Sequence, residues 1–74
     1  MASAEYDELI KQYELINNLI LDEIENLKYL LDNTLISNIN LMNIHYSISD
    51  LIIKRDNIKT EVYNISGEIL TDEI

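Results

Sequence analysis

Asp32-Asn33-Thr34 divides the 74-residue chain near its middle and carries its best local turn signal. Asn enters the left-handed conformation of helix ends more readily than most residues, and Asp and Thr favour turns and caps. Elsewhere the chain has no proline and a single glycine, Gly67, which is typical of helices. We therefore expect the chain to reverse direction near residues 32–35.

An apolar heptad repeat runs on both sides of this turn. Of the twenty a and d positions in one uninterrupted frame, fifteen are apolar. A fixed seven-residue spacing sustained over this length predicts coiled-coil-like packing of helices. The a positions are Tyr6, Tyr13, Ile20, Leu27, Thr34, Leu41, Ile48, Arg55, Val62 and Ile69, and the d positions are Leu9, Ile16, Glu23, Leu30, Ser37, Ile44, Leu51, Ile58, Ile65 and Asp72.

The turn and the repeat together predict an all-α fold, an antiparallel helical hairpin in one domain covering residues 1–74. Ser3 with acidic residues after it is a suitable N-terminal cap, and Gly67 is a suitable C-terminal stop. The expected elements are a helix over roughly 4–32, a turn near 32–35, a helix over roughly 36–66 and a short tail over 67–74.

Other arrangements are compatible with the same pattern. One is a single long coiled-coil helix of about 90 Å, because no proline forbids it. Another is a three-helix bundle with a break near Ser47, where Ser47-x-x-Asp50 resembles a capping box. Residues 43–49 also alternate as a half-buried strand would, although no Gly or Pro is nearby to turn a β-hairpin.

The apolar surface is wider than the seam that one hairpin can cover. A two-helix hairpin buries one stripe per helix, so we expect much of the remainder to be exposed in a monomer. Contiguous exposed apolar patches usually mark interfaces. The apolar residues off the a/d stripe include Leu15, Leu19, Leu21, Tyr29, Leu35, Ile36, Ile39, Met42, Tyr46 and Ile53.

Oligomerisation is the expected source of additional stability. A core in a chain this small rarely supplies more than about 3–5 kcal/mol, and the absence of cysteine rules out a disulfide. We expect the hairpin to complete a helical bundle with a protein partner or, most economically, with itself as a homo-oligomer. The expected interface residues are Tyr13, Ile20, Leu27, Leu41, Ile48, Leu51 and Ile58.

Arg55 is the only basic residue at an a position. We expect its guanidinium to lie over the seam and reach solvent. The alternative is a register-setting ion pair with an acid on a partner helix.

The net charge of -9 argues against nucleic acid and anionic membrane as partners, since both attract clustered Lys and Arg. The N-terminus has no basic and apolar signal sequence, and no run of about 20 apolar residues is present. A soluble, cytoplasmic protein is expected.

Familiar catalytic and metal-binding patterns each lack a required residue. His45 is the only histidine, and a Glu-x-x-His metal pair would need Glu at the position of Met42. Phosphate-binding loops need glycines that are absent. We therefore expect no catalytic residues, no metal, no cofactor and no small-molecule ligand, and hence no enzyme.

One segment, Ile24-Glu25-Asn26-Leu27-Lys28-Tyr29-Leu30, resembles the first helix of the small sporulation-type aspartyl-phosphate phosphatases, which are acidic helical hairpins. Their second helix carries a Ser-Gln-Glu-Leu-Asp motif. The nearest stretch here, Ser47-Ile48-Ser49-Asp50-Leu51, departs from that motif, which removes the reason to infer phosphatase activity.

These patterns favour a non-enzymatic protein–protein interaction or assembly subunit that acts through an apolar helical face. The alternative is a small acidic inhibitor or immunity-type regulator of a basic protein. The charge of -9 on a small helical frame favours that alternative, because it would steer association electrostatically.

Overall fold

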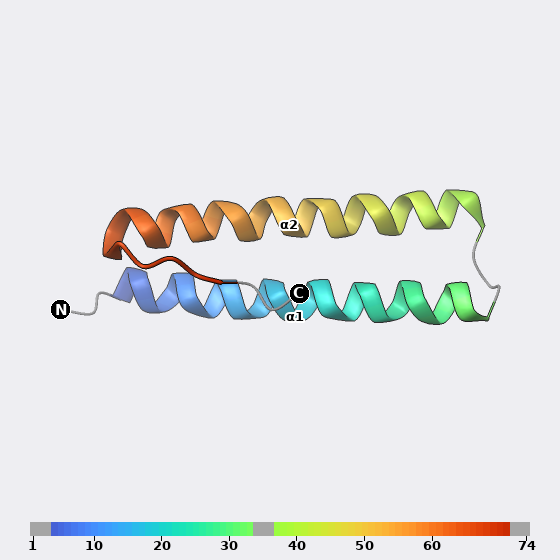
Figure 1. Cartoon of the computed structure of the whole chain (residues 1–74), viewed down its shortest axis with the longest axis horizontal. Coiled ribbons are helices and arrows are strands. Elements are labelled where there is room, and N and C mark those ends of the chain that lie inside the picture. The colour runs from blue at the N-terminus through green and yellow to red at the C-terminus, as the bar shows by residue number, and fades with distance from the viewer. Residues whose placement is uncertain (1–3, 34–36, 72–74) are drawn as a thin grey trace.

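The computed structural model describes residues 4–33 and 37–71 and folds them into two antiparallel helices (Figure 1). Helix α1 spans Ala4–Asp32 and helix α2 spans Asn38–Ser66. The molecule is a rod with principal extents of 51 × 17 × 15 Å. The helical hairpin is thus confirmed, in place of a single long helix or three short ones, and α2 continues through Ser47 without a break.

The helix ends follow local sequence signals. The range of α1 coincides with the expected one, whereas α2 begins two residues later than expected because Ser37 is its cap. Ser37 has an extended backbone, and its Oγ accepts a hydrogen bond from the Asn40 backbone N–H at 3.2 Å. The predicted Ser3 cap, the predicted turn and helix residues 34–36, and tail residues 72–74 lie outside the described residues.

Gly67 ends α2 as predicted. Its φ of 73° lies in the left-handed region, where a residue with a Cβ is strained, and its backbone N–H donates to the Tyr63 carbonyl at 2.7 Å. This geometry turns the chain out of the helix axis and directs the following residues back along the rod.

The buried core lies at one end of the rod, beside the helix ends farthest from the turn. Leu9 and Tyr13 from α1 pack there with Ile58 and Val62 from α2. Ile20, nearer the middle, is fully buried. Among the described residues, none between Ile20 on α1 and Ile58 on α2 is buried to the same degree. The half of the hairpin next to the turn is therefore held by partly exposed contacts.

Residues 67–71, here called the strap, cover the core end. Figure 1 shows them running back from α2 along α1. Leu70 packs against the buried cluster. The Tyr6 hydroxyl donates a hydrogen bond to the Glu68 carboxylate, and the Tyr13 hydroxyl donates to the Thr71 carbonyl at 3.2 Å. The strap thus supplies a third layer at the core end.

The Tyr6–Glu68 contact makes the stability of the fold depend on pH in the alkaline range. The hydrogen bond to Glu68 is the main reason that the pKa of Tyr6 is raised, with smaller contributions from partial burial and from the charges of Glu68 and Asp7. The folded chain therefore holds this proton more tightly than the unfolded chain. The resulting stabilisation is present below about pH 10, the ordinary tyrosine pKa, and is lost as pH rises through the folded value.

We expect the melting temperature of the wild type to fall more steeply above about pH 10 than that of Tyr6→Phe, which has no proton to lose there. Circular dichroism melts over this range measure the difference. Tyr29→Phe, at an exposed tyrosine, is the control and should retain the wild-type slope. Equal slopes in the wild type and Tyr6→Phe would contradict the assignment.

Candidate interaction surface

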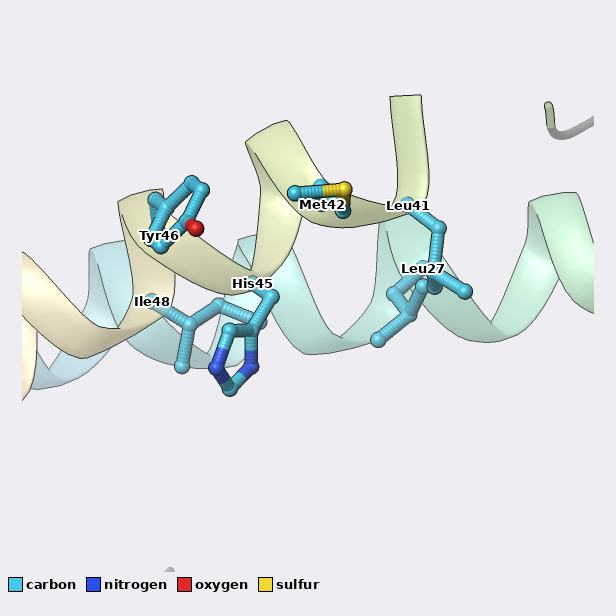
Figure 2. A pocket seen from close by; sticks show the side chains of 6 residues that line it. All are labelled: Leu27, Leu41, Met42, His45, Tyr46 and Ile48. Atoms are coloured by element: carbon cyan, nitrogen blue, oxygen red, sulfur yellow. The ribbon is translucent and has the colours of Figure 1, made fainter. Parts of the chain in front are cut away.

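An open apolar groove of about 510 Å³ lies in the half of the rod next to the turn. It is lined by one residue of α1 and five of α2 (Figure 2), namely Leu27, Leu41, Met42, His45, Tyr46 and Ile48.

The two sides of the groove come from different faces of α2. Leu41 and Ile48 occupy a positions, and their side chains extend toward α1 and Leu27, whereas Met42 and Tyr46 lie on the other side of the α2 ribbon (Figure 2). His45 lies one residue along from Tyr46, with 5.9 Å between the two ring centroids. The groove therefore connects the seam of the hairpin with the outer face of α2.

The structure divides the seven predicted interface residues into three groups. Tyr13, Ile20 and Ile58 are buried within the hairpin itself. Leu27, Ile48 and Leu51 are half-buried, and Leu41 is exposed. Three of the seven, Leu27, Leu41 and Ile48, are brought together in the groove. Whether any of them contacts another chain stays a prediction.

The excess of apolar surface predicted from the sequence is confirmed. Every residue named off the seam within the described part of the chain is exposed, namely Leu15, Leu19, Leu21, Tyr29, Ile39, Met42, Tyr46 and Ile53. Leu35 and Ile36 lie outside the described residues.

Four of these side chains form one line along α2, here called the outer stripe: Ile39, Met42, Tyr46 and Ile53. Their exposed fractions are 73%, 53%, 59% and 59%, respectively. Ile39, Tyr46 and Ile53 recur every seven residues, at the f position, which lies opposite the a/d seam on a helix. No packing between α1 and α2 can cover them. This seven-residue spacing is visible in the sequence, but the prediction of an apolar surplus did not include it.

The outer stripe belongs to α2 alone. The corresponding f positions of α1 are polar or charged: Lys11, Asn18, Glu25 and Asp32. Charge is divided in the same way, since α1 has eight acids and two lysines while α2 has three acids and three bases. Residues 33–49 carry no formal charge. Except for Ile53, the outer stripe therefore lies in the neutral part of an acidic protein.

The polar groups near this surface do not form a reactive cluster. His45 is exposed, and its ring is tilted by 55° to that of Tyr46. Within residues 4–33 and 37–71, no three His, Cys, Asp or Glu side chains gather in a way that could hold a metal ion. Over the same residues, neither helix has an apolar stretch of the length needed to cross a membrane.

No protein-family model matches the chain, and no similar curated protein or solved structure was found for it.

Arg55 departs from the expected arrangement. Its side chain is only 11% exposed, so the guanidinium does not reach freely into solvent, and its Nε lies 3.7 Å from Asp56 Oδ1 on the same helix. The a position places Arg55 in the seam, where it faces α1. The expected solvent-reaching side chain is therefore corrected to one held largely within the hairpin.

We expect Arg55→Leu to raise the free energy of unfolding by about 1 kcal/mol, because an apolar side chain fills a seam position without the desolvation of a charge. Asp56 is exposed, so the loss of its ion pair with Arg55 costs little stability. Urea denaturation of the two chains measures the change. The matched control, Lys54→Leu at the exposed neighbouring position, should shift stability by no more than about 0.5 kcal/mol. A destabilised Arg55→Leu would show that the guanidinium makes net favourable contacts.

Proposed function

We propose that the chain is a non-enzymatic interaction or assembly subunit that binds another protein chain through the apolar face of α2. The observation that carries the proposal is the outer stripe, which continues into the groove at Leu41 and Ile48. Removing such apolar side chains from water contributes about 25 cal/mol for each Å² buried, part of which offsets the entropy lost on association.

The location of the stripe supports this role. Except for Ile53, it lies in the half of the rod where the hairpin buries least of its own apolar surface, within residues 33–49, which carry no charge. Fully buried centres of protein interfaces are depleted of charge and enriched in Tyr and Met. Tyr46 and Met42 stand at the centre of this face.

The proposal is tested by replacing Tyr46 with a photo-reactive phenylalanine analogue and irradiating cells that express the chain. Tyr63, on the same helix and 55% exposed, is the matched control position. We expect a protein adduct from position 46 and little or none from position 63. The absence of any adduct from position 46, with the chain folded and expressed, would overturn the proposed function.

A second candidate function is inhibition of a basic protein through α1. The excess of six acids over lysines on α1, set against balanced charge on α2, favours it. Association driven by such a surface is steeply salt-dependent. Binding that is lost as ionic strength rises, and that maps to Asp22 and Glu25, would favour this candidate over the apolar face.

A further inference from the structure

We propose that the partner seated on the outer stripe is a second copy of this chain, with its α2 antiparallel to the first and a two-fold axis at Tyr46. This inference rests on the proposed function and names its partner. The resulting assembly has two α2 helices in contact at the centre and one α1 on each outer side, a four-helix arrangement with a two-fold, self-complementary interface.

Three of the four stripe residues are placed symmetrically about Tyr46, whereas Met42 falls opposite Asp50 of the partner subunit. Ile39 and Ile53 lie seven residues before and seven residues after Tyr46. When two such helices run antiparallel about that point, Tyr46 meets its own copy and each Ile39 meets Ile53 of the partner subunit. An apolar line of this length, 14 residues at about 1.5 Å per residue, spans roughly 21 Å. The f-position residues of the stripe, Ile39, Tyr46 and Ile53, are therefore complementary to their own copies without any shift in register.

The charges along α2 are also compatible with a second copy. In the antiparallel register, the charged residues Asp50 and Lys54 lie opposite residues 38–42, which carry no charge. Like charges are therefore never directly opposed along the stripe. The acidic α1 of each copy lies on the side of α2 away from the contact, which separates the largest negative charges of two chains that each carry -9.

The elongated shape of the chain leaves enough accessible surface for an interface of standard size. Its accessible surface is 5597 Å², whereas a compact monomer of 8.6 kDa has about 4,700 Å². The rod thus exposes about 900 Å² more than a compact chain would, and a standard stable interface buries about 800 Å² on each partner. A basic partner helix is less suited to this face, because the four stripe side chains are uncharged and Asp50 is the one carboxylate between Tyr46 and Ile53.

Sedimentation equilibrium of the full chain at micromolar concentrations tests the inference. We expect a reversible dimer for the wild type. Tyr46→Lys places two like charges on the two-fold axis and should weaken association at least about 100-fold. The control, Thr60→Lys, lies on the same exposed face but beyond the overlap with the partner helix and should leave the dimer intact. Circular dichroism checks that both variants remain helical.

Cross-linking tests the orientation. Because the chain has no cysteine, single substitutions report one contact each. Tyr46→Cys should form a disulfide with its own copy on oxidation, since the two-fold axis brings the two positions together. Ile39→Cys should cross-link to Ile53→Cys when the two variants are mixed, and only weakly to itself. Preferential self-cross-linking of Ile39→Cys would indicate parallel helices and overturn the model.

The outcomes also separate this inference from the proposed function. A chain that stays monomeric at every concentration, or a dimer that Tyr46→Lys does not weaken, overturns the second copy as the occupant. If the photo-adduct from position 46 nevertheless contains a different chain, the interaction role stands and only the self-association is wrong. If no adduct forms, both proposals fail.

Discussion

Replacing Ile20 with alanine should lower the free energy of unfolding by about 2–5 kcal/mol. Ile20 is fully buried in the seam between α1 and α2, so its removal leaves a cavity as well as losing apolar contact. A chain of 74 residues has a total stability of roughly 4–11 kcal/mol. The variant should therefore be substantially unfolded at moderate urea concentrations.

Leu19→Ala is the matched control, because it removes as many carbon atoms from the adjacent residue, which is 42% exposed. Its loss should stay below about 1 kcal/mol. Both variants are compared by urea denaturation at one protein concentration, because folding and association are linked in an oligomer. Equal sensitivity at the two positions would show that the heptad frame does not describe the seam.

Leu70→Ala should lower the free energy of unfolding by about 1–2 kcal/mol, because Leu70 packs on the buried cluster but remains partly exposed. Ile69, its neighbour in the strap, is 77% exposed. Ile69→Ala should therefore change stability by no more than about 0.5 kcal/mol. Thermal melts of the two variants measure the difference directly. Similar losses from both would mean that the strap does not cover the core as described.

The helical hairpin could be predicted from the sequence because the heptad repeat and the local helix-end signals indicate the same fold. The heptad frame fixes which face of each helix is buried, and Gly67 marks the end of α2 through a conformation that few other residues adopt. Residues 32 and 33 provide the polar break between the helices. Such features depend on neighbours within a few turns of the chain, which a sequence displays directly.

The interaction surface was only partly predictable. Its apolar residues were recognised as surplus to the seam, but their alignment along the outer face of α2 requires the helix to be continuous through Ser47, which the capping pattern there obscured. The strap was missed for another reason. Its contacts join Tyr6 to Glu68 and Tyr13 to Thr71 across some sixty residues, and no periodic signal marks them. The burial of the Arg55 side chain was not predictable either, because it depends on the shape of the facing helix α1.

The position of the core at the far end of the rod has a consequence for how the chain folds. Bringing Leu9 to Val62 closes a loop of 53 residues, whereas Leu27 and Leu41 are separated by only 14. The longer closure costs about 1 kcal/mol more in chain entropy, yet it is the one that gains full burial. Contacts beside the turn thus close a short loop but bury little apolar surface, so we expect contacts at the core end to form part of the folding transition state. Adding residues between the two helices should therefore slow folding far less than substitutions that weaken the packing of Leu9 and Val62.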